Sequence, residues 1–229
     1  MHRRRSVLAV LLTAGLLGGC TGSPDTSGPL PAGPELVNAV AETLLSLRSV
    51  HFTLGVSGGI DGLPIPQMDG DATLDGGKFG SAQGHADVQP GDTRVKLQYV
   101  LRGDEVTTTD TNGMLATLPV SEGYNPRAML GPGGSLRRLV AGATGLRTEG
   151  RERVQGVEAY RVGGTVPAAV ISGVAAGIRS EVVVKIWVSQ AEPRQVMRLW
   201  IQVPPTKDHV AAVMLELALT RQNVPVSAD

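Results

Sequence analysis

The chain has few of the residues that usually carry catalysis, metal binding or cross-links. A single cysteine among 229 residues excludes an internal disulfide, and none of the four histidines has a partner at the i, i+4 spacing of a helical metal site. Aromatic residues make up only 3%, and 21 basic residues balance 21 acidic ones, so no basic face for nucleic acid is indicated. We therefore expect a fold held by packing alone, without metal, cofactor or nucleic-acid partner.

Long apolar segments are missing too, except near the start of the chain. Residues 3–5 are arginines, and the apolar segment at residues 7–17 is about half the roughly 20 residues that a membrane-spanning helix needs. Two glycines and Cys20 follow, in the order of a secretory signal peptide that resembles a bacterial lipobox. We predict a lipoprotein signal peptide at residues 1–19 and a lipid anchor on Cys20. The alternatives are an ordinary signal peptide with a chance cysteine, or a free buried thiol.

Removal of residues 1–19 would leave a mature chain of a size suited to one domain. It would take away three arginines and no acid, so the mature chain would have a net charge of −3. Ser, Pro and Gly dominate residues 21–33, which contain too little apolar surface to fold. We expect an acylated cysteine and flexible tether over residues 20–33 and one domain over residues 34–229. Its expected location is the cell membrane, on the extracytoplasmic, periplasm-like side.

Apolar residues at helical spacing predict the first element of this domain. Pro34 and Glu35 suit the first turn of a helix, and the apolar pattern extends it to about residue 48. Shorter helices are expected at three later positions, marked by a capping residue or a proline: Asn125-Pro126, Ser135 and Pro167.

Apolar residues that alternate with polar ones predict strands through most of the remaining chain. Residues 58–70, which include two prolines, are expected to form a loop, and the aspartates at 61, 69 and 71 are expected to make turns rather than a calcium site. The predicted strands cover residues 50–56, 71–74, 84–88, 95–102, 105–109, 115–118, 159–162, 182–188, 197–203 and 210–219.

Short connections between these strands favour antiparallel pairing, because parallel strands need long crossovers. The sequence therefore predicts an α+β fold with one broad antiparallel sheet and amphipathic helices on one face. Some strands, such as residues 182–188, carry apolar residues on both faces. Either a curved sheet with a helix-covered concave face or a plain two-layer core explains that pattern.

One pattern suggests catalysis, the G-x-S-x-G arrangement of a nucleophilic serine around Ser57. His85 and His209 lie downstream and could complete a hydrolase site. That chemistry needs a helix directly after the serine, and the following residues, with prolines at 64 and 66, cannot begin one. We therefore expect no enzyme and no catalytic residue.

Several motifs, taken by their order and spacing, resemble the mycobacterial LppX/LprA/LprF/LprG lipoproteins. They lie at residues 49–54, 70–72, 125–126, 136–139, 154–157, 160–162, 186–188 and 205–208. The resemblance implies a half-barrel sheet whose concave face is covered by helices, with a large hydrophobic cavity between them. It also implies that the protein binds multi-acyl lipids or glycolipids and helps to transfer them across the cell envelope. A multi-chain lipid needs such shelter because each methylene exposed to water costs about 0.8 kcal/mol.

The candidate lining of this cavity consists of apolar residues on the predicted helices and strands. An ordinary core would use the same positions, so the alternative is a non-catalytic envelope adaptor with a filled core, tethered near a transporter or an envelope enzyme. A membrane transporter is also a candidate partner of the carrier. The candidate lining residues are Val37, Val40, Leu44, Phe52, Leu54, Leu97, Tyr99, Leu139, Val140, Ile186, Leu199 and Ile201.

Overall fold

A computed structural model of the chain describes residues 24–60, 63–205 and 212–226. Cys20 and His209 lie outside the described residues. The described part contains eleven strands and four short α-helices. The helices are α1 (Gly33–Thr43), α2 (Pro126–Leu130), α3 (Ser135–Ala141) and α4 (Ala168–Ile171). The strands are β1 (Ser49–Ser57), β2 (Gln67–Thr73), β3 (Ser81–Val88), β4 (Val95–Arg102), β5 (Glu105–Asp110), β6 (Leu115–Pro119), β7 (Thr144–Val154), β8 (Val157–Val166), β9 (Val182–Ser189), β10 (Val196–Val203) and β11 (Val213–Thr220).

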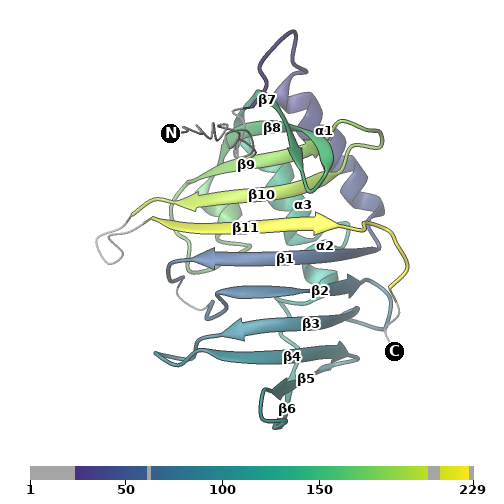
Figure 1. Ribbon diagram of the computed structural model, residues 1–229, viewed down its shortest axis with the longest axis vertical. Coiled ribbons are helices and arrows are strands. Elements are labelled where there is room, and N and C mark those ends of the chain that lie inside the picture. Colours follow the sequence, from purple (N-terminus) through teal and green to yellow (C-terminus); the bar gives the residue numbers. More distant parts are fainter. Residues whose placement is uncertain (1–23, 61–62, 206–211, 227–229) are drawn as a thin grey trace, which may run out of the picture.

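All eleven strands belong to one antiparallel sheet that stays open at both edges (Figure 1). Their order is β6-β5-β4-β3-β2-β1-β11-β10-β9-β8-β7, so the chain forms two meanders, β1–β6 and β7–β11. Pairing of β1 with β11 joins the two meanders in the middle of the sheet. The predicted α+β fold with a broad antiparallel sheet is therefore confirmed.

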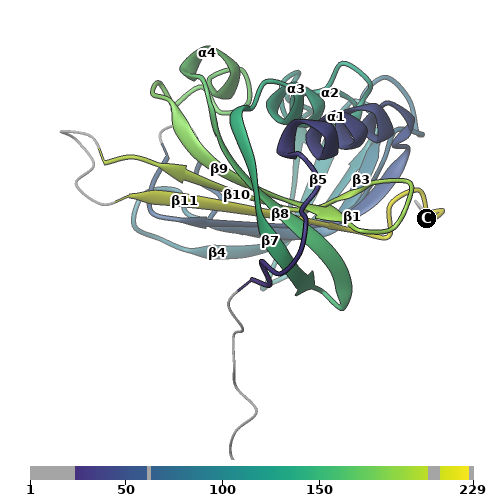
Figure 2. The same ribbon diagram turned by 90° about the horizontal axis from the view of Figure 1, so that it is seen from above.

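The four helices cover one face of the twisted, curved sheet (Figure 2). Alternate strand residues point toward them: Phe52 pairs with Leu219 and Leu54 pairs with Leu217, so these side chains share one face. The other face of the sheet, here called the outer face, is not covered by helices (Figure 2). In the described part of the chain, the helices are all too short or too polar to span a bilayer.

The first helix begins close to its predicted position but ends earlier than predicted. Leu36, Val37 and Val40 are buried on one side of α1, as the helical spacing requires. After Thr43 the helix gives way to a 3-10 turn, Leu44–Ser46. Residues three apart lie on the same side of a 3-10 turn, so Leu44 and Leu47 are both buried before β1 starts. The predicted extension of the helix to residue 48 is therefore wrong.

The two predicted helix caps in the middle of the chain differ in outcome. Asn125 caps α2 as predicted, because its side-chain oxygen accepts a hydrogen bond from the Ala128 amide at 2.8 Å. The prediction for Ser135 is wrong by one residue, since Gly134 occupies the cap position of α3. A Cβ on Gly134 would lie 2.5 Å from the Met129 carbonyl oxygen, so the close approach requires glycine there.

Two strands were poorly predicted because they lack an alternating apolar pattern. Strand β2 begins at Gln67, inside the segment expected to be a loop, and it contains Asp69 and Asp71, which were expected in turns. Strand β7 was not predicted at all, because its sequence alternates arginine, glutamate and glycine at the edge of the sheet. Other differences are small: β8 is longer than predicted, and the helix expected at Pro167 is a single turn, α4, that ends at Ile171.

The segment before α1 also differs from its prediction. Residues 24–32 lie along β7, and Asp25 forms a β-bridge with Arg151 (Figure 2). The prediction of a flexible tether up to residue 33 is therefore wrong for this described part. The edge of β7 supplies the hydrogen-bond partners that the Ser/Pro/Gly-rich segment lacks within itself.

Candidate functional site

One continuous apolar layer fills the space between the helices and the sheet. It combines residues of α1 and α3 with residues of β1 and β8–β11. Val40 on α1, Val140 on α3 and Ile186 on β9 are each 0% exposed. The helices contact the sheet through these apolar side chains, so the contact is held mainly by hydrophobic burial.

The structure brings nine of the twelve candidate lining residues together in this layer. Phe52 packs against the layer from β1 and is only partly buried. The other eight belong to the buried cluster itself: Val37, Val40, Leu44, Leu139, Val140, Ile186, Leu199 and Ile201.

The remaining three candidates lie on the same face of the sheet but outside the cluster. Leu54 and Leu97 are half-buried, and Tyr99 is buried at 6% exposure. Their registers with β11 and β3 place all three on the helix-covered face. They form an extension of the apolar layer over the β1–β4 part of the sheet.

Small residues make the floor of this extension. The helix-facing positions of β2 and β3 include Gly70 opposite Gly84 and Ala72 opposite Ala82, with Ala86 opposite the larger Met68. A Cβ on Gly70 would clash with the Tyr99 hydroxyl and with the Gln83 carbonyl oxygen, because both lie much closer than van der Waals contact. Tyr99 therefore lies flat across the two strands. Sequence reasoning missed this floor, although a glycine inside a strand often marks such a close approach.

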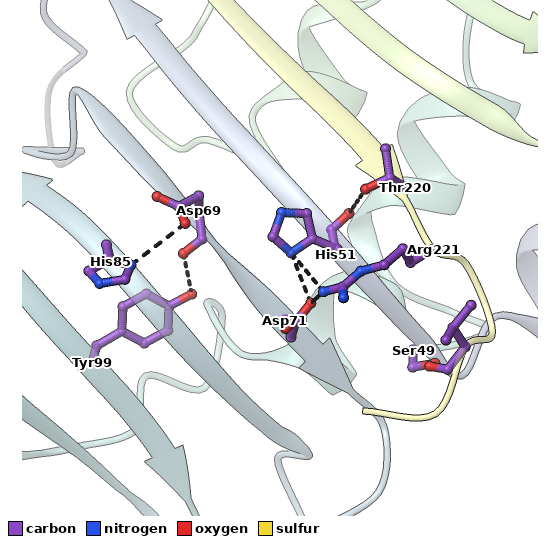
Figure 3. A network of polar contacts seen from close by, with 9 residues as sticks. Ser49, His51, Asp69, Asp71, His85, Tyr99, Thr220 and Arg221 are labelled. Atoms are coloured by element: carbon purple, nitrogen blue, oxygen red, sulfur yellow. Dashed lines mark hydrogen bonds and ion pairs between the residues drawn. The ribbon is translucent and has the colours of Figure 1, made fainter. Parts of the chain in front are cut away.

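The Tyr99 hydroxyl is held at the plane of the sheet. It donates a hydrogen bond to the Asp69 carbonyl oxygen at 3.3 Å (Figure 3). Burial raises the pKa of Tyr99 well above its ordinary value of 10.0, and the carboxylates of Asp69 and Asp71 act in the same direction. Tyr99 is therefore a neutral, mainly apolar surface at any physiological pH.

Short polar links attach the helix layer to its surroundings. The Arg127 guanidinium of α2 donates to the Leu74 carbonyl just beyond β2 at 2.6 Å. Arg137 of α3 donates to the Ala41 carbonyl of α1 at 3.0 Å. Glycines stand at the ends of α2 and α3, at Gly131 and Gly142. The helices thus form a layer of short segments, linked to the sheet at few polar points.

The outer face of β1–β3 carries a separate polar network that ties down the C-terminal segment (Figure 3). Asp71 accepts hydrogen bonds from Arg221 and from the ring of His51, whose Nδ1 lies 2.8 Å from Oδ1. Burial raises the pKa of Asp71, but the hydrogen bonds with His51 and Arg221 outweigh it, so the pKa falls below its ordinary value of 3.8. Among the described residues, no cluster of His, Cys, Asp and Glu suits a metal ion.

The lowered pKa makes the contribution of Asp71 to stability depend on pH. Asp71→Asn is expected to reduce the free energy of unfolding at pH 7 by about 1 kcal/mol. A depressed folded-state pKa stabilises the fold above the unfolded-state value and loses this effect as the pH falls through the folded-state value. The difference between the two proteins should therefore shrink below about pH 4. Urea unfolding from neutral to strongly acidic pH measures it, with the exposed Asp92→Asn as control. A difference that stays constant in acid would contradict this origin.

The residues of the G-x-S-x-G pattern are not assembled into a hydrolase site. Ser57 ends β1, and a bend and a β-bridge between Ile60 and Leu63 follow it instead of a helix. His85 lies two strands away, level with Thr53, and Ser57 lies four steps further along β1 than Thr53. That offset is about 13 Å along the strand alone, too far for a serine–histidine hydrogen bond.

An open groove of about 510 Å³ lies at the outer face over Gly55. Its two charged residues are paired, since Arg94 lies 2.7 Å from Asp87 and Glu216 lies 3.1 Å from Arg198. The residues around it are Thr53, Leu54, Gly55, Val56, Ser57, Pro66, Gln67, Arg94, Trp200, Met214 and Glu216. The groove is thus mixed in polarity and lies across the sheet from the apolar layer.

An open antiparallel sheet with short helices over its apolar face defines a class of α+β proteins whose main interior feature is an apolar layer rather than a polar cleft. Within that class the chain has a specific family. Residues 32–226 match the family model described as "LppX_LprAFG lipoprotein". The chain belongs to this lipoprotein family, so the family predicted from the sequence motifs is confirmed.

Individual relatives agree with this assignment. The chain is 32% identical over 182 residues to the lipoarabinomannan carrier protein LprG of Mycolicibacterium smegmatis, covering 77% of this chain and 76% of the relative. It is 29% identical over 207 residues to the protein of the same name from Mycobacterium leprae, covering 87% and 86%.

Two crystal structures share the fold. LprF from Mycobacterium bovis superposes with a TM-score of 0.72 at 21% identity, covering 91% of this chain and 98% of LprF. The lipoprotein LppX of Mycobacterium tuberculosis superposes with a TM-score of 0.66 at 20% identity, covering 86% and 97%. The curved α+β sheet with helices on one face is therefore the family's architecture.

Proposed function

We propose that this chain is a membrane-anchored carrier of multi-acyl lipids or glycolipids, which it helps to transfer across the cell envelope. The observation that carries the proposal is the continuous apolar layer between short helices and an open sheet. The relatives named lipoarabinomannan carrier proteins support a lipoglycan or a related lipid as cargo. The proposed role is binding and transfer without catalysis.

Acyl chains would enter by separating the helix layer from the sheet. The contacts they replace are apolar on both sides, so the contact area lost between the helices and the sheet would be regained against methylene groups. Each methylene buried from water contributes about 0.8 kcal/mol. Three or more long chains therefore supply enough free energy to hold the helices away from the sheet. The half-buried Leu54 and Leu97 would extend the apolar path toward the β1–β4 part of the sheet.

The anchor in this proposal is Cys20, which is diacylated and becomes the first residue of the mature chain after cleavage behind Gly19. Its acyl chains would hold the protein at the membrane from which the cargo is taken, on the extracytoplasmic side. Two acyl chains anchor a protein stably, whereas a single chain binds only reversibly. A membrane transporter would be the natural source of the cargo.

The test separates the anchor from the cargo. Full-length protein and Cys20→Ser protein are purified, extracted with chloroform and methanol, and analysed by mass spectrometry. The covalent anchor stays on the wild-type protein, so a multi-acyl lipid in both extracts is cargo. Delipidated protein should take up about one such lipid per chain from vesicles. Extracts without lipid, together with no uptake, would overturn the carrier function, and an unmodified Cys20 would overturn the anchor.

A second candidate is a non-catalytic adaptor with a filled core. The observation in its favour is the dense burial of the proposed lining, with Val37 at 1% exposure and both Val40 and Val140 at 0%. A filled core would neither take up lipid nor change its hydrogen exchange when lipid is offered. Faster exchange of the α3 amides after lipid uptake is expected of the carrier alone.

A further inference from the structure

The described segment before α1 is bound to one edge of the sheet. This N-terminal strap (residues 24–32) pairs with β7 through Asp25 and Arg151. The Asp25 amide donates to the Arg151 carbonyl at 2.8 Å, and the Arg151 amide donates to the Asp25 carbonyl at 2.7 Å. A pair of reciprocal backbone hydrogen bonds is the unit of an antiparallel ladder, so the strap continues the sheet by one short step.

Side chains of β7 hold the rest of the strap. The Arg151 guanidinium donates to the carbonyls of Ser27 at 2.6 Å and Pro29 at 2.7 Å. The Thr148 hydroxyl donates to the Pro31 carbonyl at 2.6 Å. These bonds join a segment that has no fully buried side chain to a strand that supplies the donors. The position of the strap is therefore specified by β7.

Gly150 makes room for the strap. A Cβ at this position would lie 2.8 Å from the Pro24 Cβ and 2.9 Å from the Asp25 carbonyl oxygen. A side chain there would push the strap away from the edge. The close approach of a second backbone thus explains why β7 has a glycine in its middle.

The length of chain before the strap sets how far the sheet edge can be from the anchor. Pro24 is the fourth residue after Cys20, and four extended steps along the chain span at most about 14 Å. A tether that was free up to residue 33 would span roughly 45 Å and would leave the domain free to turn. With the strap bound, the β7 edge cannot move far from the surface that holds Cys20.

We infer that the partner of the β7 edge is the lipid bilayer itself. The strap holds this edge against the membrane surface and points the β6 edge away from it. Ten interstrand steps separate the two edges, and they span roughly 48 Å in a flat sheet. The inference rests on the acylation of Cys20 in the proposed function and adds an orientation to it.

This orientation has a direct consequence for the apolar layer. Helix α1 follows the strap directly, and it packs close to β7, β8 and β9. That part of the layer would therefore lie beside the anchoring membrane. At the far edge, Met114, Leu115 and Leu118 are exposed large apolar side chains, at 70%, 69% and 56%. They would point away from the anchoring membrane.

The experiment places one label near each edge of the acylated full-length protein. Because acylation blocks Cys20, an introduced cysteine is the one free thiol of the chain. Fluorophores at Glu158→Cys, beside the β7–β8 turn, and at Thr117→Cys, on β6, report energy transfer to headgroup-labelled lipid in phosphatidylcholine vesicles. We expect the transfer at position 158 to be at least about threefold larger, because roughly 48 Å of sheet separates the edges.

Two variants of β7 provide the matched comparison. Arg151→Ala removes the donors to Ser27 and Pro29, so the transfer ratio of the two labels should fall toward one while the protein stays bound. Arg147→Ala removes the same charge from an exposed position of the same strand and should leave the ratio unchanged. Circular dichroism checks that both variants remain folded.

The outcomes separate this inference from the proposed function. Equal transfer from both labels, in protein whose Cys20 acylation is confirmed by mass spectrometry, overturns the orientation and leaves the carrier function standing. An unchanged ratio in Arg151→Ala overturns it as well. A protein that carries no acyl group and does not bind vesicles overturns the proposed anchor and this inference together.

Discussion

Replacing Gly70 by valine is expected to lower the free energy of unfolding by about 3 kcal/mol, the upper end of ordinary overpacking penalties. The new Cβ would clash with the Tyr99 hydroxyl and with the Gln83 carbonyl oxygen, which belongs to the backbone and cannot turn aside. Tyr99 would have to leave the position in which it is buried at 6% exposure. Urea unfolding of the variant measures the loss.

The matched control is Gly55→Val on the neighbouring strand. Nothing lies within 4 Å of a Cβ built on Gly55, which opens into the outer-face groove. Valine favours strands, so this variant should be as stable as the wild type or slightly more stable. Adding Tyr99→Ala should recover only part of the Gly70→Val loss, because the Gln83 carbonyl still clashes. Equal losses at Gly70 and Gly55 would contradict the close approach.

The parts of the fold that follow an apolar period were predictable from the sequence. Strand β4 carries Leu97, Tyr99 and Leu101 on one face, and they lie on the helix-covered side, as alternation requires. The first helix was predictable in the same way from Leu36, Val37 and Val40. In each case the positions of the apolar residues in the sequence show which side of the element is buried.

The other elements depend on contacts that no local pattern encodes. Strand β7 is stabilised by its pairing with β8 on one side and by the strap on the other, so its arginines and glutamates need no apolar face. The strap has the composition of a linker and is held by hydrogen bonds with β7, more than a hundred residues away in the sequence. Contacts between residues so far apart in the sequence cannot be predicted from patterns among neighbouring residues.

The residues of the candidate site could be predicted better than the way in which their side chains pack across the strands. Helical and strand periods place Val40, Leu139 and Ile186 toward a common interior, and the structure brings them into one cluster. The small-residue floor at Gly70 and Gly84 depends on where Tyr99 falls across the sheet, which requires the register of β2, β3 and β4. The alternation of apolar residues shows which side of a strand is apolar. The pairing register between neighbouring strands decides which side chains come into contact.

Val140→Trp is expected to separate the carrier from the filled-core adaptor. Val140 is 0% exposed in the apolar layer, and the larger indole would occupy volume that acyl chains need. Exclusion of two methylene groups would cost about 1.6 kcal/mol of binding free energy, which is more than tenfold in Kd. Lipid uptake from vesicles by delipidated protein, titrated by mass spectrometry, measures the change.

The control for this prediction lies on the same helix. Arg138 is exposed, so Arg138→Trp adds the same indole outside the layer and should leave uptake unchanged. Overpacking predicts that Val140→Trp also loses about 1–3 kcal/mol of stability in either case. Stability therefore cannot distinguish the two functions, and uptake can. A folded Val140→Trp protein with full uptake would place the acyl chains elsewhere. A wild-type protein that takes up no lipid and loses only stability on substitution would be an adaptor.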